Sequence, residues 1–306
     1  MFQIISDGGC DFTKEEAKKH NVTIVPFYIT FDQHTFLREG VDITKDEYFK
    51  RLLGDKTLFP KTSQPSPQDY MDVYTPHLEA GLDIISLTIS SKLSGTYNSA
   101  TLAARTLREE YPNRTIIVID SLSGSVGQGL ILREIIKMRD QGFSVTKTEQ
   151  YTKKVIKSTQ IYFTLDTLEY LKRGGRVGST TALVGGILGL RPVLHLVEGV
   201  IEQLDSVRGN KKVLHLMEEG LTAALEGEVE NVNLCIGHIL SEKRATTFKG
   251  NVEKALNTKI NHPAIEVGVT IGTHAGPGAL VVAYCRKYET FLRNTKEEFI
   301  VERIGA

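Results

Sequence analysis

The turn after one apolar run is crowded with hydroxyl side chains. The run Asp83–Ile89 leads directly into Ser90-Ser91-Lys92-Leu93-Ser94-Gly95-Thr96-Tyr97, where a helical stretch begins. Ligands bind at the carboxyl ends of strands in open parallel sheets, and helix N-termini favour anions. Capping would need only one serine. We therefore interpret this segment as a site whose neutral donors hold a carboxylate or a phosphate, with capping alone as the open alternative.

A second polar segment, Lys61-Thr62-Ser63-Gln64-Pro65-Ser66, places four hydroxyl or amide side chains before Pro67. A structural interpretation is available for its end, since Ser66 is a good N-cap and Pro67 a good first helical residue. That interpretation leaves Thr62 and Ser63 unexplained. These two side chains are therefore candidate donors to a ligand.

Two glycine-rich segments also carry candidate site residues. Gly174-Gly175-Arg176-Val177-Gly178-Ser179 lacks the Gly-Lys-Ser/Thr ending of a phosphate-binding loop, so a sharp turn that presents Arg176 is the alternative. The second segment, Gly272–Ala279, lies between two predicted strands, and its glycines and proline indicate an unusual backbone path. It carries His274, the histidine that we take as a candidate site residue.

Signatures of common enzymes are missing from the chain. The sequence contains no Gly-x-Ser-x-Gly elbow, no His-Glu-x-x-His, no Cys-x-x-Cys and no Gly-x-Gly-x-x-Gly after a strand. The residues alone therefore indicate an anion-accepting cleft without naming its ligand.

The first half of the chain alternates between predicted strands and predicted helices, which would position these segments. Buried strands that alternate with helices indicate a parallel sheet covered on both faces, a three-layer α/β/α domain. The predicted strands are Phe2–Ser6, Val22–Thr30, Asp83–Ile89 and Thr115–Ile119. The predicted amphipathic helices are Tyr97–Glu110 and Gly127–Arg139, with a shorter helix capped by Thr13.

The second half has a different pattern, which predicts a two-layer α/β domain with a mixed sheet. Pro192–Val197 and Val200–Ser206 alternate around Glu198-Gly199, a two-residue signal for a hairpin turn. Further strands are predicted at Gln160–Leu165, Asn233–Gly237, Ile265–Ile271 and Ala279–Tyr284, and helices at Leu168–Lys172, Lys211–Leu225 and Glu242–Leu256. We place the boundary near Lys157, which divides the chain into domains 1–157 and 158–306.

Charge and composition exclude several functional classes. The 306 residues include 41% hydrophobic and 24% charged residues, the balance of an ordinary globular protein. Because 37 basic residues face 37 acidic ones, no net charge draws the protein to nucleic acid. The most apolar window, Thr181–Leu190, is about half the length needed to span a bilayer.

The cysteines and the start of the chain indicate a cytoplasmic protein. Cys10, Cys235 and Cys285 are odd in number and far apart, so neither a disulfide framework nor a metal site is expected. The first residues show no basic stretch before a long apolar run, and we therefore expect no signal peptide.

Taken together and in this order, the polar segments resemble the DegV family. The matching stretches are Asp7 and Asp11, Thr62–Ser66, Ser90–Tyr97, Asp166–Arg176 and His274–Gly278. Each piece alone is weak, but the set covers nearly the whole chain. Glycines stand in the first turn where the family usually places a hydroxyl residue, and we expect Asp7 and Asp11 to act only as turn and helix caps.

The resemblance implies a bacterial lipid-binding protein with a long-chain fatty acid, such as palmitate, between its two domains. Members known as FakB-like carriers hold the acid for phosphorylation by a separate fatty acid kinase subunit and take part in fatty acid metabolism. The resemblance implies no catalytic residue, no metal, no cofactor and no nucleic acid, and it allows transient membrane contact. The fatty-acid-binding residues that it implies are Thr62, Ser63, Ser94, Gly95, Thr96 and His274, and the partner-contact residues are Arg176 and Arg208.

An enzyme is the alternative. The family fold resembles dihydroxyacetone kinase subunits, and an acyl hydrolase could use Ser94 as nucleophile and His274 as base. The sequence shows no evident acid to orient that histidine. The apolar stretch Leu183–Leu190 is a candidate sheath for an acyl chain, and an ordinary core helix is its other interpretation.

Overall fold

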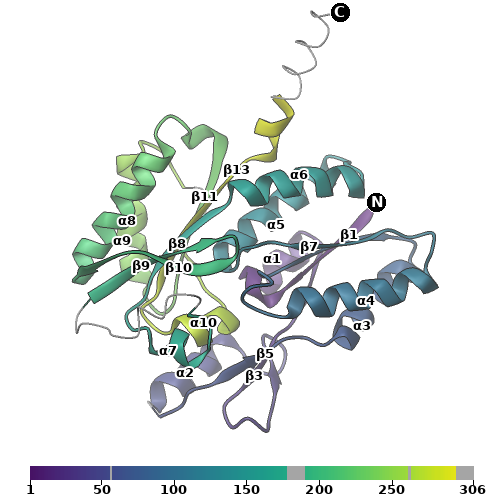
Figure 1. Cartoon of the computed structure of the whole chain (residues 1–306), viewed down its shortest axis with the longest axis horizontal. Coiled ribbons are helices and arrows are strands. Elements are labelled where there is room, and N and C mark those ends of the chain that lie inside the picture. The colour runs from purple at the N-terminus through teal and green to yellow at the C-terminus, as the bar shows by residue number, and fades with distance from the viewer. Residues whose placement is uncertain (56, 178–189, 261–262, 294–306) are drawn as a thin grey trace, which may run out of the picture.

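Each half of the chain builds its own β-sheet, and the two sheets face one long helix between them. The computed structural model describes residues 1–55, 57–177, 190–260 and 263–293 (Figure 1). The first sheet is parallel, with strand order β2-β1-β6-β7. Its strands are β1 (Phe2–Asp7), β2 (Val22–Val25), β6 (Asp83–Thr88) and β7 (Ile116–Asp120).

Helices cover both faces of this sheet. Successive side chains of a strand point to opposite faces, so Ile4 and Ile5 enter different clusters. Ile5 packs with α3 (Pro67–Glu79) and α4 (Thr96–Glu110). Ile4 packs on the other face with α5 (Ser125–Asp140) and α6 (Val145–Ser158). The predicted three-layer arrangement is confirmed.

The predicted strand Val22–Thr30 is wrong, because the chain forms two strands there. The edge strand β2 ends at Val25, directly before Pro26, which has no N–H group to donate to a ladder. The next strand, β3 (Tyr28–Thr30), lies in a separate antiparallel sheet of order β4-β3-β5. Its other strands are β4 (Leu37–Arg38) and β5 (Lys61–Ser63). The remaining helices of the first half are η1 (Gly8–Cys10), α1 (Lys14–Lys19) and α2 (Lys45–Gly54).

The second half forms a mixed sheet of order β10-β9-β8-β13-β11-β12, in which only the β11–β12 pair is parallel. Its strands are β8 (Gln160–Thr164), β9 (Leu190–Val197), β10 (Val200–Arg208), β11 (Val232–His238), β12 (Ile265–Glu266) and β13 (Leu280–Arg286). Helices α8 (Asn210–Leu225) and α9 (Glu242–Ala255) cover one face, as Figure 1 shows in green. The other elements are α7 (Glu169–Arg173), η3 (Val229–Asn231) and α10 (Val269–Ala275). The predicted mixed-sheet class is confirmed.

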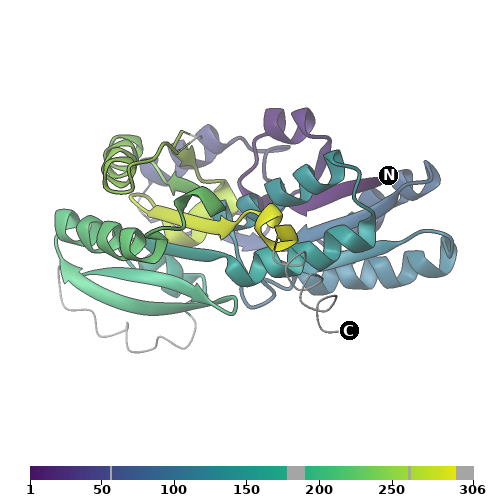
Figure 2. The ribbon, with the colours of Figure 1, turned by 90° about the horizontal axis from the view of Figure 1, so that it is seen from above.

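The hairpin of this sheet turns where the sequence predicts it. Glu198 and Gly199 have φ angles of 48° and 84°, the positive values that the two central residues of a type I′ turn require. The turn points toward the N-terminal half (Figure 2).

Helix α5 lies between the two sheets, and it confirms the helix predicted over Gly127–Arg139, although more of its surface is buried than an amphipathic pattern predicts. Twelve of its 16 residues are buried, because it contacts β1 on one side and β11 and β13 on the other. Only a narrow strip that includes Arg133, Lys137 and Asp140 reaches solvent. Its fully buried Glu134 accepts hydrogen bonds from the Tyr288 backbone N–H at 2.7 Å and the Asn233 amide at 2.8 Å.

The proposed boundary at Lys157 falls in the last turn of α6, just before β8 begins. One hydrophobic cluster contains residues of both halves, including Ile4 and Val281. The division into domains 1–157 and 158–306 therefore stays a prediction. Most of the candidate sheath Leu183–Leu190 lies outside the described residues, which include only Leu190 of it. None of the helices in the described ranges is both long and apolar enough to cross a membrane.

Replacing Glu134 with Ala should lower the free energy of unfolding by about 2–4 kcal/mol, because it leaves buried N–H donors without an acceptor. Urea unfolding followed by circular dichroism measures this loss. Glu109→Ala, on the exposed surface of α4, is the matched control and should change little. Equal stability of the two variants would show that the buried carboxylate does not join the halves.

Candidate functional site

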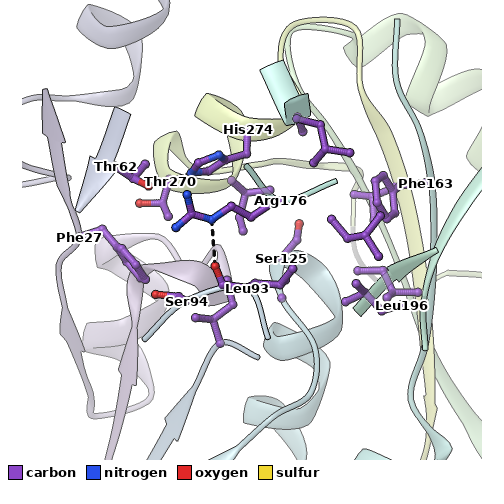
Figure 3. A pocket seen from close by; sticks show the side chains of 18 of the residues that line it. Phe27, Thr62, Leu93, Ser94, Ser125, Phe163, Arg176, Leu196, Thr270 and His274 are labelled. Carbon is purple, nitrogen blue, oxygen red and sulfur yellow. Dashed lines mark hydrogen bonds between the residues drawn. The ribbon is translucent and has the colours of Figure 1, made fainter. Parts of the chain in front are cut away.

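A cavity lies between the two sheets, at the carboxyl ends of β6 and β7. The cavity has a volume of about 120 Å³, and it is partly open to solvent. Figure 3 shows polar side chains gathered at one end, with Phe163 and Leu196 on the opposite side. The cavity is thus polar at one end and apolar at the other.

The polar end joins residues that are far apart in sequence. Thr62 and His274 are hydrogen-bonded, with 2.8 Å between Oγ1 and Nε2. Ser94, Thr270 and Arg176 also line this part of the cavity (Figure 3). The structure therefore brings together three of the predicted binding residues, Thr62, Ser94 and His274.

Thr62 reaches the cavity from the small sheet. It is the middle residue of β5 and pairs with Ile29 of β3. Ser63, the next residue, points to the opposite face of the strand, and it does not line the cavity. The structure therefore separates these two predicted donors.

His274 lies on helix α10, and not on the predicted loop after a strand Ile265–Ile271. Only Ile265 and Glu266 form a strand there. The Glu39 carboxylate accepts hydrogen bonds from the Val269 N–H at 2.6 Å and the Thr270 N–H at 3.2 Å. Because these donors have no partner within the helix, a carboxylate from the other half of the chain stabilises a helix that local β-branched residues disfavour.

A second carboxylate supports the same helix. Asp11 accepts hydrogen bonds from the Gly268 N–H at 2.9 Å and the Ser125 hydroxyl at 2.6 Å. Burial raises the pKa of Asp11 to about 6 and that of Glu39 to about 7, and the charge of Asp11 contributes to the Glu39 shift. The two carboxylates thus lie close together with little water around them.

The predicted capping role of Asp7 is also confirmed. Its carboxylate accepts from the Gly9 N–H at 2.9 Å at the start of η1, and from the Ile89 N–H at 2.8 Å. Burial raises the pKa of Asp7 to about 6. Asp7 therefore anchors the backbone directly before the serine-rich turn.

Within that turn, the predicted residues have different surroundings. The Ser94 hydroxyl lines the cavity and lies 2.6 Å from the Thr96 hydroxyl. Thr96 is buried and does not line the cavity. A Cβ atom at Gly95 would lie 2.3 Å from Gln64 Oε1, so a side chain there would displace the Gln64 side chain. Gly95 thus allows the two segments to pack closely.

The two arginines predicted to contact a partner lie in different places. Arg176 is half-buried and lines the cavity, where its Nε donates to the Leu93 carbonyl at 3.1 Å. Arg208 is exposed at the end of β10 and does not line the cavity. The structure therefore places only Arg176 beside the polar end.

The electrostatics keep the histidine neutral. Burial and, to a smaller extent, the positive charge of Arg176 lower the pKa of His274 to about 4. Its Nδ1 atom is buried and has no hydrogen-bond partner in the described part of the chain. The ring thus contributes hydrogen bonding without charge at neutral pH.

Sequence analysis missed most of the apolar wall. Phe163, Val281, Leu196 and Ile201 lie on one face of the second sheet and line the cavity. Their strands alternate in the way that predicts one covered face, but that pattern does not distinguish a face packed on a helix from one that encloses a ligand.

The geometry gives little support for catalysis. Across residues 1–55, 57–177, 190–260 and 263–293, no hydrogen bond joins Ser94 to His274, and no carboxylate contacts Nδ1 of that histidine. The same residues contain no cluster of His, Cys, Asp and Glu that could hold a metal ion.

Known proteins resemble this chain over nearly its whole length. Residues 1–287 match the model of a family described as uncharacterised proteins of the DegV family. A DegV domain-containing protein of Caldanaerobacter subterraneus subsp. tengcongensis is 32% identical over 292 residues, which cover 93% of this chain and 98% of the relative.

Solved structures agree with this match. A stearic-acid-binding protein of Eubacterium ventriosum is 35% identical, with a TM-score of 0.90 over 95% of this chain and 100% of that one. A DegV family protein of Thermus thermophilus, described by its fatty acid binding, is 30% identical, with a TM-score of 0.84 over 93% of this chain and 99% of that one.

The His274 ring should be neutral at pH 5.5 and take up a proton only near pH 4. Since this pKa lies below the usual 6.5, the unfolded chain binds the proton first, and His274 lowers protein stability as the pH falls from 6.5 towards 4. Nitrogen-detected NMR of the imidazole measures the titration. Arg176→Met should raise the pKa, whereas Arg173→Met, whose guanidinium is paired with Glu169, is the control. A ring protonated at pH 5.5 would contradict the assigned environment.

Proposed function

The chain belongs to the DegV family, and from this premise we propose that it binds a long-chain fatty acid in the cavity between its two sheets. The carboxyl group lies against Thr62, Ser94 and His274, and the acyl chain extends along the apolar wall. The observation that carries the proposal is the polarity of the cavity, with the Thr62–His274 pair at one end and hydrocarbon side chains beyond it.

The head-group chemistry suits a carboxylate. When the neutral His274 ring carries its hydrogen on Nε2, it donates to the Thr62 oxygen and leaves the threonine hydroxyl hydrogen for the ligand. The Ser94 hydroxyl supplies a second neutral donor. Arg176 adds a positive charge at the same end without an ion pair to a described carboxylate.

The acyl chain supplies most of the affinity in this proposal. Each buried methylene contributes about 0.8 kcal/mol, whereas a hydrogen bond to a charged group contributes about 1.5–3 kcal/mol. A chain of about sixteen carbons therefore outweighs two or three head-group hydrogen bonds. Solved relatives described as binding stearic acid and, more generally, fatty acid support this ligand class.

We further propose that the protein is a non-catalytic carrier that presents the carboxyl group to a separate fatty acid kinase subunit. A carboxylate held mainly by neutral hydroxyls keeps oxygen lone pairs available to accept the phosphoryl group. The separate hydrogen bonds of Ser94 and His274 favour this role over the hydrolase alternative. Three buried, unpaired cysteines favour a reducing compartment, and we propose the cytoplasm. We also propose transient membrane contact during lipid exchange. The net charge of zero favours no role in nucleic-acid binding.

Thr62→Val and Ser94→Ala should each weaken palmitate binding by roughly tenfold or more, since each removes a donor to a charged group. Displacement of a fluorescent fatty acid measures the affinity. Thr247→Val, on the exposed surface of α9, is the control and should bind like the parent. Unchanged affinity in both site variants would contradict the head-group assignment, and a parent that binds no fatty acid would contradict the function.

Arg208→Ala should keep palmitate affinity within twofold and slow phosphorylation of the bound acid by the kinase subunit by roughly tenfold. Arg208 is exposed and does not line the cavity. Its side chain is therefore available to a partner protein but not to the bound lipid. Arg105→Ala, exposed on α4, is the control. Loss of lipid from the Arg208 variant, or full phosphorylation, would contradict a partner contact.

A further inference from the structure

The tip of the β9–β10 hairpin is seated on the other half of the protein. The Ser90 hydroxyl donates a hydrogen bond of 2.9 Å to the Gly199 carbonyl, and both residues are buried. A Cβ atom at Gly199 would lie 2.3 Å from Ser90 Oγ and 3.3 Å from the Leu122 side chain. The tip therefore fits closely against the ends of β6 and β7.

This contact lies between two parts of the cavity wall. On the hairpin, Leu196 and Ile201 pair across the strands just before and just after the tip, and both line the cavity. On the opposite side, Leu93 follows Ser90, and Gly124 follows Leu122, and these two also line it. If the hairpin tip moved away from Ser90 and Leu122, the cavity wall would therefore open between the hairpin and the first half of the chain.

The hairpin lies at the edge of the second sheet. In the strand order, β10 is the outermost strand and pairs only with β9, while α8 packs against both strands. Val197, next to the tip, and Leu122, on the opposite side, are each 37% exposed. In the described part of the chain, the hydrogen bond between Ser90 and Gly199 joins neutral groups, and such a hydrogen bond contributes only about 0.5–1.5 kcal/mol.

A fatty acid whose chain lies deep between two sheets needs a route by which that chain enters and leaves. At the polar end, where the head group is held, the Arg176 contact with the Leu93 carbonyl joins the two halves of the chain. Ser90 and Gly199 do not line the cavity. They hold two wall segments together without contacting the ligand.

We propose that the β9–β10 hairpin is a gate for the acyl chain, and that the Ser90–Gly199 hydrogen bond is its latch. The inference rests on the proposed fatty acid binding and adds a route for entry and exit. Weakening the latch raises the populated fraction of the open gate. Entry and exit then accelerate together, and the equilibrium affinity hardly changes.

Stopped-flow release of cis-parinaric acid into excess palmitate tests the gate. Ser90→Ala should accelerate both uptake and release on the order of fivefold, with a dissociation constant within twofold of the parent. Gly199→Ala should accelerate both rates further, because its Cβ atom would lie against Ser90 Oγ at a φ of +84°. Gly227→Ala is the matched control, because its φ is +74° and no atom lies within 4 Å of the added Cβ. Its rates should equal those of the parent.

The outcomes separate the gate from the function. Unchanged rates in Ser90→Ala and Gly199→Ala, with parinaric acid still bound, would overturn the gate and leave the carrier in place. Faster release without faster uptake would also overturn it, because that pattern indicates a lost ligand contact. If the parent itself bound no parinaric acid, the proposed function would fail instead. Should Gly199→Ala not fold, Ser90→Ala decides alone.

Discussion

Glu39 holds the N-terminus of a helix that belongs to the other half of the chain, and the binding end of the cavity depends on this interaction. Without the carboxylate, the first N–H groups of α10 would be left without acceptors at a site with little water. The helix carries both Thr270 and His274 into the cavity wall. The position of the head-group site is thus set by a charge that does not line the cavity.

Burial of these ionisable groups disfavours their charged forms. Desolvation raises the pKa values of Asp7, Asp11 and Glu39, and it lowers that of His274. In all four groups, burial away from water disfavours the charged form. The carboxylates are compensated by backbone N–H groups, whereas the histidine remains neutral. Arg176 is the cation that lines the cavity in the described part of the chain. An acidic ligand would therefore enter an environment where its charge meets neutral donors and one guanidinium.

The sequence predicted well what local rules determine. The hairpin at Glu198-Gly199 follows from turn chemistry, and the hydroxyls of Thr62 and Ser94 stand out because capping does not explain them. Helix α10 could not be predicted from its own residues, since its cap comes from a position 230 residues away. The burial of Glu134 on α5 escaped prediction for a related reason, because its partners Asn233 and Tyr288 come from the second half of the chain. The place of Arg176 in the wall likewise depends on a contact with Leu93 from the first half.

The contacts that assemble the site also set when it can form during folding. Thr62 and His274 are 212 residues apart, and Ser90 and Gly199 are 109 residues apart. Closing loops of this length costs entropy that only the finished packing repays, and contacts of high sequence separation form slowly. A chain still leaving the ribosome can build the parallel sheet of the first half, but it has no α10 and hence no complete polar end. The ability to hold a ligand should therefore be among the last properties that the newly made protein acquires.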